Sequence, residues 1–312
     1  MALALLLLAA LVATPKEEAA AAQKARRERT AALLEQGRLV QAKNELKAEL
    51  RTLATDLEAK ADVLSELGEV YVHLERHNEA VGAHEEAVEL LDALHGGSDP
   101  RRWVAVGKLA DSHHRLGNHA QAVALYKELV ENMLAGPFGA GHPGMRITLG
   151  KLGAAAMAIQ DAKSAIGAFE QLIQLAEGDD SAAALNARAD ANLQLARALS
   201  LRKKKAASTR SKANRAQLEK ALKHARAARD IFKAIPEGDM MDVAYSTNGI
   251  AGVLELLDRD DEAIAAMEEA YRLALEAKGA EDDPDVLRAK KNSDGLRAHI
   301  ERKLKRRQKP EL

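Results

Sequence analysis

Histidine is the residue type whose spacing in this sequence could do chemistry, because an imidazole nitrogen is a common ligand of zinc. Ten histidines occur in the chain. His73 and His77 lie four residues apart, which would place both side chains on one helical face with Glu69 one turn away. The repeat pattern described below, however, puts His77 in a turn between helices and gives His84 the place of a packing aromatic residue. We therefore expect core or solvated histidines and no metal site.

Sequence motifs of common catalytic sites give no support to an enzyme. The chain has no H-E-x-x-H metalloprotease motif, no G-x-x-x-x-G-K-S/T phosphate loop and no G-x-S-x-G nucleophile turn. It also has no cysteine, which excludes disulfide frameworks, thiolate metal sites and cysteine nucleophiles. We expect a protein that is not an enzyme and that needs no cofactor.

The composition indicates an all-helical protein. Of the 312 residues, 47% are hydrophobic and 30% are charged but only 3% are aromatic, and Ala, Leu, Glu, Lys and Arg dominate. Alternating runs of β-branched residues, which would predict strands, are nearly absent. The formal net charge of -1 gives no overall attraction to nucleic acid, so no specific nucleic-acid partner is expected.

A set of residues recurs at constant offsets, and this internal repetition is the strongest signal in the chain. Each full copy starts with an apolar residue, two variable residues, a second apolar residue and a small residue. Further small or bulky residues follow 12, 16 and 19 positions after that small residue. Small residues let two helices approach closely, and the larger ones fill the space between pairs. The copies begin at Leu64, Val106, Leu149 and, in shorter form, Ile250.

These offsets resemble the W-x2-L-G-x2-Y…A-x3-F signature of the tetratricopeptide repeat, and the resemblance covers residues 23–302. Leu67, Leu109 and Leu152 are 42 and 43 residues apart, which is longer than the usual ~34. The long repeats and a G-x-x-H-P linker at residues 139–143 resemble those of kinesin light chains. The resemblance implies an all-α fold, a right-handed superhelical solenoid of stacked antiparallel helix pairs.

The predicted solenoid covers residues 61–279 and carries one irregular repeat. Leu193 and Gln194 open this fifth copy, but its second helix comes 15 residues later than the register predicts. The residues in between form a basic run, 202–215. They either extend the first helix or form a polar loop that projects from one face. We favour a solvated loop, with contact to anionic lipid, nucleic acid or an acidic partner as the alternative. Residues 280–312 are expected to form a capping helix and a basic tail.

Residues 23–60 are predicted to form a degenerate first repeat, in which Arg29 and Thr30 replace the expected apolar-small pair. A heptad-like stripe of leucines between Leu46 and Leu67 contains no Gly or Pro. A long continuous helix or a short coiled coil is therefore an alternative here. We favour two successive solenoid helices with a polar turn near Lys60.

Residues 1–22 are predicted to be a signal peptide or a hydrophobic leader. The stretch MALALLLLAALVAT is apolar but shorter than the roughly 20 residues that a membrane-spanning helix needs, and the alanines at 20–22 offer a cleavage site. The last residues, 309–312, read K-P-E-L and resemble the K-D-E-L retention signal with Pro in place of Asp. We expect a protein of the secretory pathway, either retained in the endoplasmic reticulum lumen or exported. An uncleaved anchor and a cytoplasmic protein are the alternatives.

The resemblance places the first helices of the repeats along a concave groove. One end of this groove is predicted to be polar and its middle apolar, which would fit an extended or helical peptide. We predict a non-catalytic scaffold or adaptor that binds protein or peptide partners. The alternative is a membrane-anchored helper subunit of an enzyme or transport complex, and membrane contact is left open through the leader or the basic run. The predicted groove residues are Glu69, His73, Asp111, His114, Arg115, Asn192, Tyr245, Asn248 and Glu255.

Overall fold

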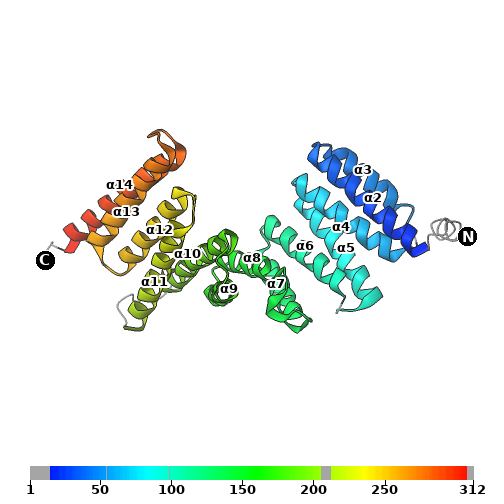
Figure 1. Cartoon of the computed structure of the whole chain (residues 1–312), viewed down its shortest axis with the longest axis horizontal. Coiled ribbons are helices and arrows are strands. Elements are labelled where there is room, and N and C mark those ends of the chain that lie inside the picture. Colours follow the sequence, from blue (N-terminus) through cyan, green and yellow to red (C-terminus); the bar gives the residue numbers. More distant parts are fainter. Residues whose placement is uncertain (1–14, 54, 98, 205–211, 308–312) are drawn as a thin grey trace, which may run out of the picture. The chain divides into compact units, whose positions relative to one another are not determined.

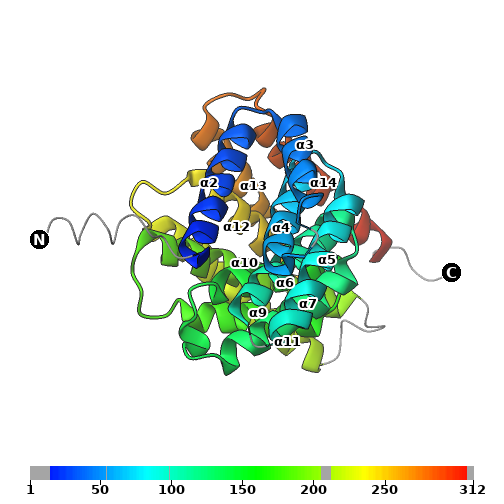
Figure 2. The same cartoon turned by 90° about the vertical axis from the view of Figure 1, so that its right-hand side faces the viewer.

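The computed structural model describes residues 15–53, 55–97, 99–204 and 212–307. In these residues the chain forms 13 α-helices, labelled α2 to α14, and one short 3-10 turn, η1, with no β-strand. Two orthogonal views show helices joined by short connections (Figure 1 and Figure 2). The predicted all-α class is confirmed.

The helices divide into two compact units, one ending at Gly136 and the other beginning at Pro137. In the first unit three helix pairs follow one another along the chain, and each pair contacts the next. The pairs are α2 (Pro15–Glu35) with α3 (Leu39–Leu50), α4 (Leu57–His73) with α5 (His77–His95), and α6 (Pro100–Leu116) with α7 (His119–Ala135).

The second unit begins with η1 (Gly139–Gly141), continues with three helix pairs and ends with one further described helix. Each pair again contacts its neighbour in the chain. The pairs are α8 (Met145–Ala158) with α9 (Ala162–Leu175), α10 (Ala182–Lys204) with α11 (Lys212–Ala234), and α12 (Met240–Leu256) with α13 (Asp260–Lys278), and the last helix is α14 (Pro284–Arg307).

Small residues allow the two helices of a pair to pack closely. In α9, Phe169 lies directly against Gly153 of α8, and its ring occupies the space that a β-carbon would need. The alanines found 12 positions after the small residue of each copy have no exposed surface, and these are Ala80, Ala122, Ala165 and Ala263. The offsets read from the sequence are therefore packing positions.

Aspartates begin several of the helices. At each of these helix starts the Asp side chain accepts a hydrogen bond from a backbone N–H two or three residues later, which satisfies a donor that has no partner inside the helix. The residues are Asp56, Asp99, Asp161 and Asp239.

The turn inside most pairs contains a left-handed residue five positions before the buried alanine. Gly37 and Gly117 fill this position, with φ of 69° and 88°. Glu75, Gln160 and Asp258 adopt the same left-handed backbone, with φ of 57°, 58° and 58°. Because a β-carbon is strained in this conformation, glycine suits the position best.

The first repeat consists of two separate helices, α2 and α3, and the chain turns again before α4. The structure has the two successive helices that we favoured over residues 46–67, but the turn between them lies between Leu50 and Leu57 rather than at Lys60, which is in the first turn of α4. The alternative of one continuous helix over residues 46–67 is wrong. Asp56 explains where the break falls, since its side chain accepts a hydrogen bond from the Ala59 N–H and so caps α4.

The register of the fifth repeat differs from the sequence prediction by two residues. Leu195 and Ala196 are buried, at 0% and 2% exposure, and they form the apolar-small pair in place of Leu193 and Gln194. The interval from Ala196 to Ala221 is 25 residues, where the other copies have 12. Both helices take up the extra length, since α10 and α11 have 23 residues each.

Several predicted segments lie outside the described residues. They are residues 1–14 of the leader, residues 205–211 of the basic run and residues 308–312 of the tail. The predicted cleavage site at residues 20–22 lies within α2. Among the helices that the structure describes, none combines the length and the apolar character that a membrane span requires.

Candidate functional site

Two adjoining cavities open on the second unit, where first helices of neighbouring pairs face one another. One has a volume of about 310 Å³ and lies among α10, α12, α13 and α14. The other has a volume of about 380 Å³ and lies among α8, α10 and α12. Arg197 and Asn248 line both cavities, so we treat the two as one candidate site.

Tyr245 has a fixed position at the first cavity because Arg288 holds it. Arg288 Nη2 donates a hydrogen bond of 2.7 Å to the Tyr245 hydroxyl, and the guanidinium carbon lies 5.5 Å from the ring centroid. The same Nη2 lies 2.8 Å from Asp285 Oδ1, one turn earlier on α14. An aromatic face and a paired cation are therefore presented together on this wall.

The second cavity is the more apolar of the two. Met157, Leu193 and Val253 belong to its lining. Gly252 leaves space there, since a β-carbon at this residue would meet no heavy atom within 4 Å. Glu255 is also in the lining, and its Oε1 lies 3.5 Å from His299 Nε2, an ion pair when that imidazole is protonated. The cavity suits an apolar side chain with a polar group beside it.

Arg197 supplies a positive charge to both cavities. Its side chain is exposed, and its Nη1 donates to Gln194 Oε1 at 3.4 Å. Burial raises the pKa of Asp190, and the charge of Asp242 raises it further, whereas Arg197 lowers it. Burial likewise raises the pKa of Asp242, with a smaller contribution from Asp239. The cavity linings themselves contain Arg197 and Arg288 together with Asp285 and Glu255, so charges of both signs lie beside apolar surface.

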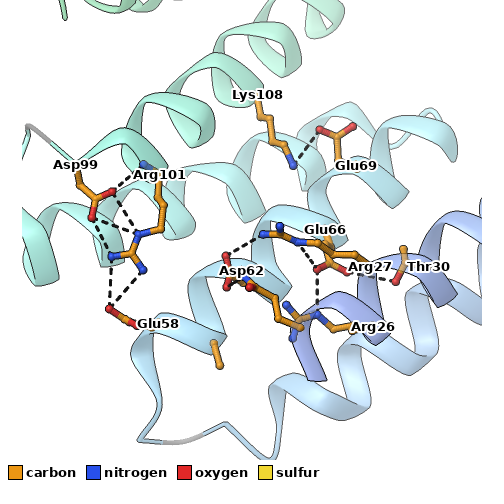
Figure 3. A network of polar contacts seen from close by, with 12 residues as sticks. Arg26, Arg27, Thr30, Glu58, Asp62, Glu66, Glu69, Asp99, Arg101 and Lys108 are labelled. Carbon is orange, nitrogen blue, oxygen red and sulfur yellow. Dashed lines mark hydrogen bonds and ion pairs between the residues drawn. The ribbon is translucent and has the colours of Figure 1, made fainter. Parts of the chain in front are cut away.

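In the first unit, two of the predicted groove residues engage side chains of neighbouring helices. Lys108 Nζ lies 3.5 Å from Glu69 Oε1, an ion pair between α6 and α4 (Figure 3). The Tyr126 hydroxyl on α7 donates a hydrogen bond to Asp111 on α6. Burial raises the pKa of Tyr126, and the hydrogen bond to Asp111 raises it further, so the hydroxyl keeps its proton. These contacts fix both carboxylates within the helix stack.

The remaining predicted residues of the first unit lie nearer the surface. His73 and Arg115 are exposed. The ring centroids of His114 and His119 lie 4.8 Å apart, and their Nδ1 atoms are 3.1 Å apart. This end of the predicted groove is polar.

The structure brings three of the nine predicted residues together in one place. Tyr245, Asn248 and Glu255 all line the cavities of the second unit. Asn192 is not with them: it is buried at 5% exposure, and its Oδ1 lies 2.8 Å from His224 Nδ1 on α11. The two-residue shift in register is the reason, because it turns a predicted groove position into an interior one.

Arg197, Arg288 and Asn292 line the first cavity but were not identified from the sequence. Arg197 was missed because of the two-residue register shift. It takes the place in the helix that the predicted register gave to Leu195. Arg288 and Asn292 were missed because the last helix was treated only as a cap. An available signal was the Asp283-Pro284 start of that helix, which repeats the Asp-Pro start of α6.

No metal or nucleotide site emerges from the motifs. The described residues contain no group of three His, Cys, Asp or Glu side chains that could hold a metal ion. Gly139, Gly141 and Gly144 do have the G-x-G-x-x-G spacing. In the structure this run forms η1 and the turn before α8. Helix α7 precedes it, whereas a dinucleotide-binding loop follows a β-strand.

Comparisons with known proteins identify the repeat. Residues 59–135 match the family model of the tetratricopeptide repeat. RxLR effector protein SFI4 of Phytophthora infestans (strain T30-4) is 24% identical over 230 residues, which cover 74% of this chain and 63% of that protein. Secreted RxLR effector protein RXLR-C07 of Plasmopara halstedii is 22% identical over 242 residues, which cover 78% and 70%. The chain therefore spans less than two thirds of the first relative's length. Its own sequence contains no Arg-x-Leu-Arg run.

Solved structures support the same fold. The TPR-like repeats attributed to a kinesin light chain of Podosopora anserina match with a TM-score of 0.55 at 17% identity, over 72% of this chain and 99% of that one. BtubC (BKLC) from P. vanneervenii matches with a TM-score of 0.57 at 16% identity, over 80% and 94%. The STAND protein PH0952 of Pyrococcus horikoshii, which has a tetratricopeptide repeat sensor, matches with a TM-score of 0.62 at 14% identity, over 88% and 38%. The chain has a solenoid fold of long tetratricopeptide repeats, of the kind seen in kinesin light chains.

Proposed function

We propose that the protein is a non-catalytic interaction scaffold whose second unit binds a peptide segment of a partner protein in the two adjoining cavities. The observation that carries the proposal is that an apolar cavity and a polar cavity share Arg197 and Asn248. A peptide lying across both would place an apolar side chain in the second cavity. Its next polar group would then lie near the Tyr245–Arg288 pair.

The cavities have the size and the chemistry that this role needs. Volumes of about 310 and 380 Å³ fall at the lower end of the range of ligand pockets. Asn248 lies between the two cavities, and its amide can donate to a peptide carbonyl and accept from a peptide N–H. Arg197 adds a charge that favours an acidic group on the partner.

We further propose that this scaffold works in the secretory pathway or after export. Support comes from the apolar leader in residues 1–22 and from the relative in Plasmopara halstedii whose name describes it as secreted. The intact mass of the protein from its own cells tests this point. Loss of about the first 22 residues supports export, and an intact, freely soluble protein contradicts it.

Selection of peptide binders tests the proposed site. A displayed library of random peptides is panned against the full chain, and the affinity of each selected peptide is measured by fluorescence anisotropy. Asn248→Ala is expected to weaken binding at least about tenfold, which corresponds to ~1.4 kcal/mol. Gln174→Ala removes a similar amide from the exposed face of α9 and is expected to leave affinity unchanged. Selected peptides that bind both variants as tightly as the natural chain would show that the cavities are not the site.

A further inference from the structure

Charged side chains in the middle of α2 hold this helix to its neighbours in the first unit (Figure 3). Arg26 Nε donates to Glu66 Oε1 at 3.0 Å, and Arg26 Nη1 donates to Glu49 Oε1 at 3.1 Å. Arg27 Nη2 lies 3.5 Å from Asp62 Oδ1. The partners lie on α3 and α4, so these ion pairs span the two interfaces that α2 makes.

Two further polar contacts continue the same row along α2. Arg29 Nε lies 2.7 Å from Glu45 Oε2 on α3, and the Thr30 hydroxyl donates to Glu66 Oε2 at 3.3 Å. Arg27 and Arg29 keep 58% and 69% of their side chains exposed, so water and salt reach their pairs, whereas Arg26 and Glu66 keep only 11% each. Exposed ion pairs of this kind weaken as ionic strength rises.

Apolar packing of α2 begins only near its carboxyl-terminal end. Leu33 is 6% exposed and belongs to the core cluster that α3 and α4 form. Earlier in the helix, Ala22 and Ala25 are exposed, and with Ala48 they line a cavity of about 470 Å³ between α2 and α3. Residues 20–30 of α2 therefore gain little from the hydrophobic effect.

The sequence explains why this interface is polar. Arg26 and Arg29 precede the left-handed residue Gly37 by the same intervals at which Leu64 and Leu67 precede the left-handed residue Glu75. The two arginines therefore take the places in α2 that the two leucines hold in α4. A leucine at either place packs into its pair, whereas an arginine must find a carboxylate. Arg26 Nη2 is buried and has no hydrogen-bond partner among the described residues, which disfavours the docked position.

We propose that residues 20–30 of α2 form a strap that salt releases. At low ionic strength the strap lies over the carboxylates of Asp62 and Glu66, and at high ionic strength it leaves them while Leu33 keeps the rest of α2 in place. Release uncovers acidic side chains on the first helix of the second repeat. The first unit thus presents different surfaces at different ionic strengths, independently of the cavities in the second unit.

Hydrogen exchange of the full chain, followed by mass spectrometry, tests the strap. Between about 0.05 M and about 1 M sodium chloride, the screening length falls from roughly 14 Å to 3 Å. We expect the amides of residues 20–30 to exchange at least about tenfold faster at the higher salt concentration, while the amides of α4 keep their protection. Equal exchange of residues 20–30 at both salt concentrations would overturn the proposal, as would a parallel loss of protection in α4.

Two variants separate release of the strap from a general effect of salt. Glu66→Gln removes the carboxylate shared by Arg26 and Thr30, and residues 20–30 should then exchange at low salt as fast as they do in the natural chain at high salt. Lys24→Gln is the matched control, because Lys24 pairs with Glu28 inside α2, at 3.9 Å, and its loss should change nothing. A Glu66→Gln chain whose strap stays protected at low salt refutes the proposal.

Discussion

The imidazole of His84 on α5 lies directly against Gly68 on α4, in the space where any other residue at position 68 would place its β-carbon. The ring is also hydrogen-bonded: Nδ1 lies 2.8 Å from Ser112 Oγ, and Nε2 lies 3.2 Å from the Ser65 carbonyl oxygen. One buried histidine therefore links α4, α5 and α6. Its role is to pack the first unit rather than to do chemistry.

Gly68→Ala is expected to lower the free energy of unfolding of the first unit by about 1–3 kcal/mol, because the added methyl group overlaps the His84 ring. Gly82→Ala, on the same helix pair, is the matched control: its β-carbon meets nothing within 4 Å, so a gain of about 0.5–1 kcal/mol is expected. Trp103 is the single tryptophan and lies in the first unit, so its fluorescence during urea unfolding reports both changes. Equal effects of the two substitutions would contradict the packing account.

His84 also makes the stability of the first unit depend on pH. Burial lowers its pKa from 6.5 to about 4, and the charge of Lys108 adds to this, while Glu69 and Asp111 oppose it. The unfolded chain then binds a proton between these pH values that the folded chain excludes. Stability is therefore complete above about pH 6.5 and falls as the pH drops toward 4, by up to about 3 kcal/mol.

Urea unfolding at several pH values measures this dependence. His84→Gln keeps a polar side chain but cannot be protonated, so the part of the slope that His84 supplies should disappear. His299→Gln, at a side chain that is 58% exposed, should retain the slope of the natural chain. A His84→Gln chain with an unaltered slope would assign the pH dependence to other groups.

Filling the apolar cavity should weaken peptide binding without unfolding the protein. Gly252→Leu places a side chain in open space between α10 and α12, so binding of selected peptides is expected to weaken at least about tenfold. Gly167→Leu, on α9, also meets nothing within 4 Å at its β-carbon and serves as the control. Thermal unfolding checks that both variants fold. Tight binding to the Gly252→Leu chain would exclude this cavity from the binding site.

The left-handed turns offer a reciprocal test in one unit. Glu75→Gly should raise the free energy of unfolding by about 0.5–1 kcal/mol, because glycine adopts a φ of 57° without strain. Gly117→Glu makes the opposite change at the equivalent turn, where φ is 88°, and should lower it by about 1 kcal/mol. Both changes are read from Trp103 fluorescence in urea. Changes of the same sign would show that side-chain contacts rather than backbone strain decide these turns.

Most of the fold was predictable because its packing depends on residue size at short range. A small residue at Gly153 and an alanine 12 positions later can bring two helices together whatever surrounds them. The fifth repeat was predicted less well because alanine is frequent throughout α10, so that several phases of the pattern fit the sequence. Burial in the structure selects Ala196, and with it the place of Arg197.

The candidate site was predictable only where a single helix determines it. Tyr245, Asn248 and Glu255 share one face of α12, and the helical period is enough to group them. Arg288 joins them from α14, 43 residues after Tyr245, through a contact that no local pattern encodes. The ion pairs of α2 are of the same kind, since Arg26 meets Glu66 across 40 residues.

The long interval between Ala196 and Ala221 also bears on how a gene for such a chain can change over generations. An insertion inside the packed part of either helix keeps its apolar face in phase only if it adds whole turns, about 3.6 residues each. A codon gained or lost within α10 would instead rotate one face by about 100° and expose its leucines. Heritable changes of length inside either helix should therefore add or remove whole helical turns. Single-codon insertions or deletions there should be rare among descendants.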